Sequence, residues 1–378
     1  MKIAILTQPL RTNYGGILQA YALQTILHDM GHTVVVIRRE HSYPSLLTFL
    51  MRIGSILKCA VRKYIFRHSR IKIMSPLSPY YHIDECGFDV LPFVKERINQ
   101  SPEIRSSKAL AKYFKRNKFD AYVVGSDQVW RPCYSPCITD FFLKEVQRES
   151  KALKIAYAVS FGTDVWEFTN EQTAQCAILA KEFDAVSVRE DSAVELCAQY
   201  LGIDALHVLD PTMLLDEEHY ISLIDEKNMS SNTLLCYILD NSADKLDVMN
   251  VLAHQLALPV SCNSTRSDKN HFSQPSVQDW LKSFKGASFV FTDSFHGCVF
   301  SIIFKKTFVV FSNRDRGLAR IESLLSKFGL RHRLVSSFDD FMMREEELLT
   351  AIDYTLIDKV KQSEKELSLK FLLNSLSK

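Results

Sequence analysis

The stretch KIAILTQPLRTNYGGILQAYALQTILHDMGHTVVVI, residues 2–37, decides the fold of this chain. It opens with an apolar run at 3–6, which is typical of a buried parallel strand, and continues through a polar loop at 7–16. Apolar residues then recur at helical spacing over 17–27, and a second apolar run follows at 34–37. Strand, loop, helix and strand in this order predict the opening unit of a doubly wound α/β domain.

The same alternation of strands and helices continues along the chain in two sets. The first set predicts further strands at 121–124, 155–159, 185–188 and 207–209. The second set, which follows Asp210-Pro211-Thr212, predicts strands at 234–239, 260–261, 289–292 and 308–311. We therefore predict an α/β fold of two Rossmann-like domains that face a cleft. The predicted divisions are an N-terminal domain over 1–212, a C-terminal domain over 213–345 and a helical segment over 346–378.

The composition is that of an ordinary globular protein. Of the 378 residues, 47% are hydrophobic and 24% are charged, which excludes a mostly disordered chain. Lys and Arg total 46 and Asp and Glu total 44, so the formal net charge is only +2 and does not favour a nucleic-acid partner. No stretch approaches the roughly 18 apolar residues of a membrane span, and the apolar run at 3–6 is too short for a signal peptide, so we expect a cytoplasmic protein.

The cysteines and the short motifs do not predict a metal site. The chain has nine cysteines, an odd number, and only Cys133 and Cys137 lie close together, so free thiols are expected. There is no D-x-D, H-E-x-x-H or G-x-S-x-G motif. Metal-dependent sugar transfer, zinc proteolysis and serine hydrolysis therefore lack their usual signatures.

Residues 45–72 form a basic amphipathic insertion in the first domain. Apolar residues recur there at spacings of three and four among many Lys and Arg, and no acid occurs between Glu40 and Asp84. This pattern favours a helix on a membrane surface that carries anionic headgroups. An insertion that packs its apolar face on the domain explains the same pattern, and the two interpretations are compatible.

Ligands of open α/β sheets bind beyond the carboxyl ends of the strands, so polar residues that follow apolar runs are the candidates for a site. Asn13-Tyr14-Gly15-Gly16 opens the first helix, and its backbone N–H groups favour an anion, although a plain tight turn explains it as well. Gly125-Ser126-Asp127-Gln128-Val129-Trp130-Arg131 follows a strand. Asp127 is either a helix cap or a general base, and Gln, Trp and Arg beside it are typical of sugar sites.

Three further places combine basic residues with strand ends. Ser160-Phe161-Gly162 lies in the same set as Arg189, which is suited to bidentate recognition of a carboxylate or phosphate, or to a surface pair with Glu190 or Asp191. Thr292-Asp293-Ser294-Phe295-His296-Gly297 puts a histidine at the start of a helix, where it is a proton donor, a phosphate contact or a structural residue. The last predicted strand is followed by Arg314, Arg316 and Arg320, of which the latter two share a helix face, either in a site or in solvent.

Taken in order, these motifs resemble the polysaccharide pyruvyl transferase family. The matching stretches are 13–24, 125–130, 158–162, 187–190, 209–212 and 292–297, and the resemblance extends over residues 3–330. It implies a fold similar to the GT-B glycosyltransferases. It also implies transfer of a pyruvyl group from phosphoenolpyruvate to a sugar, usually as a cyclic ketal with release of phosphate. The acceptors are typically lipid-linked glycans or precursors of exported polysaccharide, such as capsule.

The resemblance also implies roles for the candidate residues. His296 is the acid or phosphate stabiliser, and Asp127 is the base or a ligand of the acceptor hydroxyl. The acceptor sugar is expected to contact Gln128, Trp130 and Arg131. The donor is expected to contact Arg189, Asn13, Gly15, Gly16, Ser160, Ser294, Arg316 and Arg320. No cofactor or metal is required, because phosphoenolpyruvate is a co-substrate.

One position departs from the family. Many members carry Arg two residues before the motif histidine, where this chain has Ser294. Either Arg11, Arg316 or Arg320 supplies that charge, or the donor binds in a different pose.

Two other functions stay open. A GT-B glycosyltransferase that uses a nucleotide-sugar fits the predicted fold equally well, and a non-catalytic glycan-binding descendant is supported by Ser294. The partners predicted for the transferase are phosphoenolpyruvate and a glycan or lipid-linked oligosaccharide, with no nucleic acid. Contact of the basic segment at 45–72 with the inner face of the membrane would hold such an enzyme near its acceptor.

Overall fold

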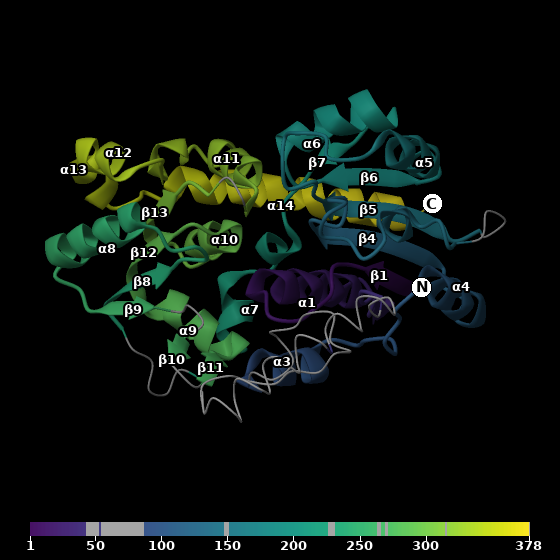
Figure 1. Ribbon diagram of the computed structural model, residues 1–378, viewed down its shortest axis with the longest axis horizontal. Helices are drawn as coiled ribbons and strands as arrows, with labels where there is room; N and C mark the ends of the chain where they lie inside the picture. Colours follow the sequence, from purple (N-terminus) through teal and green to yellow (C-terminus); the bar gives the residue numbers. More distant parts are fainter. Residues whose placement is uncertain are drawn as a thin grey trace.

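The computed structural model describes residues 1–42, 53, 87–146, 151–225, 231–262, 266–268, 271–313 and 316–377. The chain forms two α/β lobes, each built on its own parallel sheet (Figure 1). The basic segment at 45–72, Ile53 apart, and Arg314 lie outside the described residues. In the described part of the chain no helix is long and apolar enough to cross a membrane.

The first lobe holds a six-stranded parallel sheet in the order β2-β1-β4-β5-β6-β7. β1 (Lys2–Leu6) and β2 (Thr33–Ile37) confirm the strands predicted in the opening stretch. The other strands are β4 (Ala121–Asp127), β5 (Leu153–Val159), β6 (Ala185–Val188) and β7 (Leu206–His207). β4 continues past the predicted end of its apolar run, because its pairing with β5 extends to Asp127.

The helix α1 (Tyr14–Asp29) lies at the centre of the molecule. Every side chain from Tyr14 to Leu23 is buried, which is expected of a helix that is apolar on all sides. Its hydrophobic cluster joins Ile5 of the first sheet to Val290 of the second lobe. The other helices of the first lobe are α3 (Val90–Arg97), α4 (Ser107–Arg116), α5 (Asn170–Ala180) and α6 (Asp191–Leu196), which continues as a π-turn over Cys197–Leu201.

The second lobe holds a five-stranded parallel sheet in the order β14-β13-β12-β8-β9. Its strands are β8 (Thr233–Tyr237), β9 (Val260–Cys262), β12 (Ala287–Thr292), β13 (Thr307–Phe311) and β14 (Leu334–Val335). Its helices are α7 (Glu217–Ile221), α8 (Ala243–Leu256), α9 (Val277–Gly286), α10 (Phe295–Ile303), α11 (Leu318–Lys327), α12 (Phe338–Met343) and α13 (Glu345–Leu349). The two helix-flanked parallel sheets confirm the predicted fold class.

A small third sheet was not predicted. It contains β10 (Arg266–Asp268), β11 (His271–Gln274) and β3 (Gly87–Phe88), with β11 antiparallel to β10 and parallel to β3. These strands are short, and β3 pairs with β11, which is far away in the sequence. No local sequence pattern therefore predicts them.

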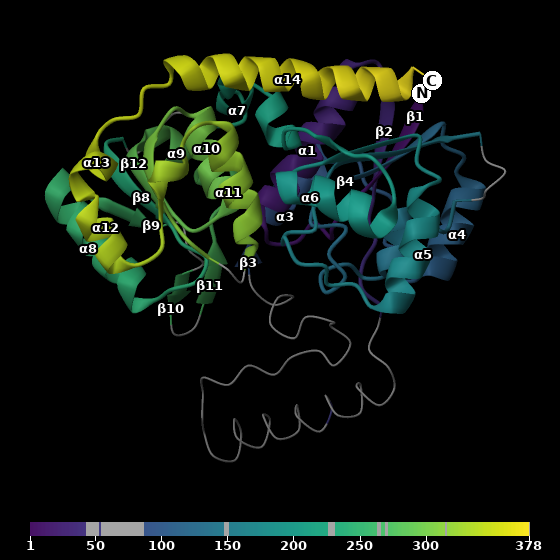
Figure 2. The ribbon, with the colours of Figure 1, turned by 90° about the horizontal axis from the view of Figure 1, so that it is seen from above.

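The helix α14 (Thr355–Leu376) runs across both lobes (Figure 2). In the second lobe, the hydroxyl of Tyr354 donates hydrogen bonds to the carbonyls of Ser301 and Lys306. In the first lobe, the backbone N–H of Leu209 donates to the hydroxyl of Ser368 on α14 at 3.0 Å. The sequence predicts one helical segment here, but a non-helical turn over 350–354 separates α13 from α14.

Each sheet has a point where the chain leaves two neighbouring strands in opposite directions. In the first lobe these strands are β1 and β4, and in the second they are β8 and β12. Such a switch point leaves a crevice at the carboxyl ends of the strands, where ligands bind. The residues that follow all four strands line a single pocket between the lobes.

Candidate active site

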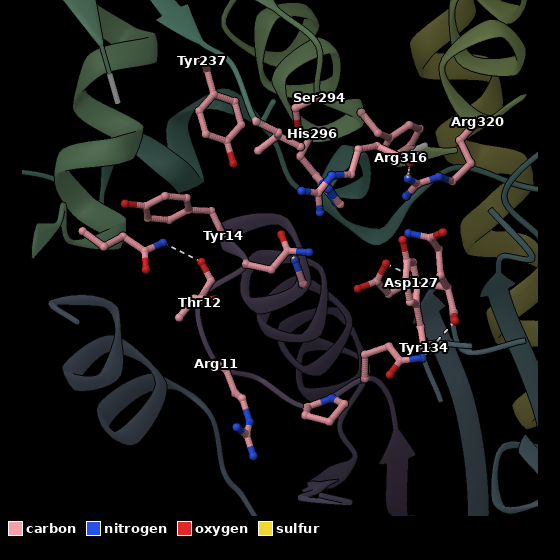
Figure 3. Close-up of a pocket in the computed structure, with 18 of the residues that line it drawn as sticks. Arg11, Thr12, Tyr14, Asp127, Tyr134, Tyr237, Ser294, His296, Arg316 and Arg320 are labelled. Carbon is pink, nitrogen blue, oxygen red and sulfur yellow. Dashed lines mark hydrogen bonds between the residues drawn. The ribbon is translucent and has the colours of Figure 1, made fainter. Parts of the chain in front are cut away.

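The pocket between the lobes has a volume of about 760 Å³. Arg320, Ser294 and His296 reach it from the second lobe, and Asp127 and Tyr134 reach it from the first (Figure 3). Among the candidate residues named from the sequence, those that line it are Arg11, Asn13, Gly16, Asp127, Gln128, Ser294, His296, Arg316 and Arg320. The candidates that do not line it are Gly15, Trp130, Arg131, Ser160 and Arg189.

The glycines at the start of α1 allow both lobes to approach this helix. A Cβ atom at Gly15 would lie 1.9 Å from Nδ1 of His296, and one at Gly16 would lie 3.3 Å from Oδ2 of Asp127. Asn13 caps the helix, and its side-chain oxygen accepts from the N–H of Gly16 at 3.3 Å. The glycines therefore bring the histidine and the carboxylate to the same helix end, where the helix dipole favours negative charge.

Asp127 is the carboxylate at the carboxyl end of β4. Its backbone has φ of 74°, a left-handed conformation that is uncommon for residues other than glycine. Its Oδ1 accepts from the N–H of Gln128 at 2.8 Å and lies 3.6 Å from the guanidinium of Arg189. The side chain is 9% exposed, so a ligand in the pocket can reach it while bulk water is largely excluded.

His296 is the second residue of α10 and faces Asp127 across the N-terminus of α1. Its Nε2 lies 3.7 Å from Oδ2 of Asp210, an ion-pair distance that is too long for a hydrogen bond. This buried nitrogen has no hydrogen-bond partner among the described residues. The imidazole can therefore exchange a proton with a ligand.

Asp210 is held by a dense set of hydrogen bonds at the junction of the lobes. Its Oδ2 accepts from Arg189 at 2.7 Å and from Ser126 at 3.3 Å, and its Oδ1 accepts from the N–H and hydroxyl of Thr212 at 3.0 and 2.7 Å. Burial by itself would raise the pKa of Asp210, but His296, Arg189 and Thr212 hold that pKa well below its ordinary value. Sequence reasoning marked this aspartate only as part of a boundary and a family motif.

Arg189 lies behind the pocket wall and is 1% exposed in its side chain. Burial opposes its charge, but Asp210, Asp127 and Glu190 raise its pKa, so the guanidinium stays charged. The alternative of a surface pair with Glu190 or Asp191 is wrong, because both Arg189 and Glu190 are buried. Arg189 does not line the pocket, and its guanidinium donates to Asp210 at 2.7 Å.

Ser160 and Glu190 shape the loop that follows β5. Oε1 of Glu190 accepts from the hydroxyl of Ser160 at 2.9 Å and from the N–H groups of Phe161 and Gly162 at 2.8 and 3.0 Å. Burial raises the pKa of Glu190. Ser160 therefore supports the site from behind and does not face a donor.

The predicted acceptor residues divide between the pocket and the core. Gln128 lines the pocket, and its side-chain oxygen accepts from Arg131 at 3.2 Å, while Arg131 also pairs with Glu167 at 2.8 Å. Trp130 is fully buried, stacks on Phe142 at 4.5 Å and donates from Nε1 to a backbone carbonyl. The prediction that Trp130 contacts a sugar is therefore not met in this structure, because hydrophobic packing takes the indole into the core.

Three tyrosines to which the sequence analysis assigned no role also line the pocket. Tyr14 stacks on Trp280 at 5.2 Å, Tyr237 ends β8, and Tyr134 is 38% exposed. The sequence offered only their positions as a signal: Tyr14 begins a helix, Tyr237 ends a strand, and Tyr134 follows the motif at 125–131. Aromatic faces with polar tips suit a hydroxyl-rich sugar. No group of three or more His, Cys, Asp or Glu residues in the described ranges could hold a metal ion.

Two Rossmann-like lobes around a cleft are the arrangement of the GT-B fold. Solved structures with this fold include the UDP-GlcNAc 2-epimerase from Neisseria meningitidis bound to UDP-GlcNAc, which is 9% identical with a TM-score of 0.54 and coverage of 99% of this chain and 100% of that chain. The UDP-GlcNAc 2-epimerase from Methanocaldococcus jannaschii is also similar, with 12% identity, a TM-score of 0.50 and coverage of 93% of each chain. These likenesses concern the fold alone.

The family follows from the sequence motifs that surround the cleft. The model of the polysaccharide pyruvyl transferase family matches residues 13–316, so the chain belongs to this family and the predicted resemblance is confirmed. No curated protein matches the chain at a significant level. Family membership supports pyruvylation of a polysaccharide as the general activity.

Proposed function

We propose that this protein transfers a pyruvyl group from phosphoenolpyruvate to a sugar of a glycan and closes it as a cyclic ketal with release of phosphate. The observation that carries this proposal is the juxtaposition of His296 and Asp127 on either side of the α1 N-terminus, in a pocket between the lobes. The reaction needs one acid and one base on opposite sides of a reacting carbon, and the pocket offers one from each lobe.

The reaction balances without an oxidant or reductant. A proton adds to C3 of phosphoenolpyruvate, a sugar hydroxyl oxygen bonds to C2, and the bond from C2 to the phosphate oxygen breaks. A second hydroxyl closes the ketal on the same carbon. The two hydroxyls release two protons, of which one replaces that taken up by C3 and the other leaves on phosphate.

We assign the acid role to His296 and the base role to Asp127. Asp210 lies 3.7 Å from Nε2 of His296, and this buried nitrogen has no hydrogen-bond partner among the described residues. Asp127 accepts only from the N–H of Gln128 among the described hydrogen bonds, which leaves its outer oxygen available to a hydroxyl. Arg189 holds both carboxylates in place through Asp210 at 2.7 Å and Asp127 at 3.6 Å.

The acceptor is proposed to lie against the polar and aromatic wall that Gln128 and Tyr134 contribute. A lipid-linked glycan is the proposed acceptor class. The basic segment at 45–72 would bring the pocket close to such an acceptor at an anionic membrane surface.

The test begins with donor binding, because binding does not require the acceptor to be known. Phosphoenolpyruvate at 100 times its Kd should stabilise the native protein by about 2.7 kcal/mol and raise the thermal midpoint. UDP- and GDP-sugars are the comparison ligands. Stabilisation by a nucleotide-sugar alone would contradict the proposal and favour a glycosyltransferase. Absence of any response to millimolar phosphoenolpyruvate would also contradict it.

Turnover is then measured as phosphate release in the presence of a glycan acceptor. His296→Ala should lower the rate by about 100-fold to 10,000-fold, the usual contribution of a general acid. His254→Ala is the matched control, because His254 lies exposed on α8, away from the pocket. Equal rates for the two variants would remove His296 from the mechanism, and they are expected if the protein only binds glycans.

A further inference from the structure

Arg320 is a buried arginine without an acidic partner. The residue is 6% exposed and lines the pocket. Its guanidinium donates a hydrogen bond to the backbone carbonyl of Arg316, but its Nε is buried with no partner among the described residues. No described carboxylate forms an ion pair with it. Burying an unpaired charge is unfavourable, so a binding partner for this guanidinium is expected.

The other arginines around the pocket are already matched by carboxylates. Arg316 forms a bidentate pair with Asp240, with both contacts at 2.8 Å, and this pairing lowers the pKa of Asp240 to about 2. Arg11 pairs with Glu40 at 2.7 Å. Arg189 forms ion pairs with Asp210 at 2.7 Å and Asp127 at 3.6 Å, although its Nε and Nη2 have no hydrogen-bond partner among the described residues. The unmatched positive charge in the described part of the pocket therefore lies at Arg320.

The local backbone brings this guanidinium to the junction of the lobes. Gly317 precedes α11 with φ of 88°, and a Cβ atom there would lie 2.3 Å from the carbonyl oxygen of Gly162 and 2.9 Å from Nε of Arg320. The absent side chain lets Arg320 lie against the loop of the first lobe. The guanidinium also lies over the ring of Phe295 at 5.4 Å.

A second guanidinium shares the same aromatic ring, because Arg189 lies 4.6 Å from the centroid of Phe295. Burial first, and the charge of Arg189 second, lower the pKa of Arg320 to about 10, and the charges of Asp127 and Glu190 oppose this shift only in part. The ligand-free site thus holds two buried cations close together. An anion that entered the pocket would relieve this repulsion and satisfy the free Nε donor.

We infer that Arg320 binds an oxyanion group of the donor, and is the arginine that supplies the charge missing at Ser294. This inference rests on the proposed function, since it assigns the phosphate or the carboxylate of phosphoenolpyruvate to this side chain. It also separates two arginines that the sequence could not rank: Arg320 contacts the donor, and Arg189 positions Asp210.

The test uses Arg320→Met, which removes the charge and keeps much of the buried volume. The full-length variant is melted alone and with phosphoenolpyruvate, inorganic phosphate or pyruvate. We expect the ligand-free variant to melt at or above the wild-type midpoint, because an unpaired buried charge is gone. We also expect its Kd for phosphoenolpyruvate to rise at least about tenfold. Arg331→Ala, an exposed arginine beyond α11, is the charge-matched control and should keep the wild-type response.

The outcomes distinguish a failure of the role assigned to Arg320 from a failure of the proposed function. If the wild type responds to phosphoenolpyruvate and Arg320→Met responds equally, this inference fails and the proposed function stands. If the wild type does not respond, the proposed function fails as well. A large drop in the ligand-free midpoint of Arg320→Met would show a structural role and overturn the inference.

A second variant of Arg320 and two simpler ligands, inorganic phosphate and pyruvate, complete the experiment. If Arg320→Met does not fold, Arg320→Gln removes the charge and keeps a polar side chain, and wild-type affinity in that variant would also overturn the inference. Protection of the wild type by inorganic phosphate, lost in the variant, assigns the phosphate group to Arg320. Protection by pyruvate, lost in the variant, assigns the carboxylate.

Discussion

Asp210 is the residue on which the buried charges of the site converge. Arg189 donates to it, His296 lies at ion-pair distance, and Thr212 and Ser126 satisfy its remaining lone pairs. It is fully buried, so its carboxylate is favourable only because these partners surround it. The same residue lies between the two sheets in the sequence, and its contacts come from both lobes.

We predict that Asp210→Asn destabilises the protein by about 3–5 kcal/mol at neutral pH, because it leaves the Arg189 charge buried without its partner. The folded-state pKa of Asp210 is lowered, so its stabilisation is fully present above its ordinary value of 3.8 and is lost as the pH falls further. Urea denaturation measures the free energy of unfolding of the wild type and of Asp210→Asn. The difference between the two should be constant near neutral pH and should narrow below pH 3.8.

Asp216→Asn is the control for this comparison. Asp216 pairs with Lys365 at the surface and is 63% exposed in its side chain, so its loss should cost less than about 1 kcal/mol. If Asp210→Asn also lowered the free energy of unfolding by less than about 1 kcal/mol, the assigned charge network would be contradicted. A difference from wild type that does not narrow in acid would contradict it as well.

The helix α1 shows how one element serves both fold and site. Its apolar residues join the two lobes, and its first turn carries two glycines where helix propensity alone would favour larger residues. Gly15 is explained by His296, whose ring occupies the space that a Cβ atom would take. The two glycines therefore lower the local stability of the helix, and they allow the catalytic candidates to approach each other closely.

We predict that Gly15→Ala lowers the turnover of phosphoenolpyruvate by about 100-fold or more, because the new methyl group displaces the His296 ring. Phosphate release under saturating donor measures this effect. Gly31→Ala is the control at the other end of α1, where φ is 86° and no atom lies within 4 Å of the added Cβ. That variant should lose about 1–2 kcal/mol of stability and keep its turnover. A fully active Gly15→Ala protein would exclude His296 from the role proposed above.

The helix α14 connects the two lobes, because it begins on the second lobe and ends on the first (Figure 2). Its buried face joins the hydrophobic cluster that contains both sheets, and its Phe371 lies 6.2 Å from Tyr157 of β5. The helix therefore packs on both lobes at once.

We predict that Leu372→Ala lowers the free energy of unfolding by about 2–5 kcal/mol, since Leu372 is fully buried in the shared cluster. Leu373→Ala is the matched control on the next position of the same helix, where the side chain is 50% exposed. That variant should change stability by less than about 0.5 kcal/mol. Chemical denaturation followed by circular dichroism distinguishes the two, and equal effects would mean that α14 does not pack as described.

Local patterns in the sequence predict the two α/β sets and the strand ends from which site residues project. Apolar periodicity is local, so it located β1, α1 and β12 to within a few residues. It also marked Asp127 and His296 as candidates, because ligands of open α/β sheets bind beyond the carboxyl ends of the strands. The family motifs followed from the same stretches.

Only the tertiary structure decided which of these residues meet. Trp130 and Arg189 follow strands just as Asp127 does, yet one enters the core and the other turns to Asp210. The pairing of β3 with β11 and the crossing of α14 between the lobes also have no local signal. The physical reason is that burial and charge pairing depend on side chains distant in sequence, whose positions are fixed only when the two lobes pack around α1.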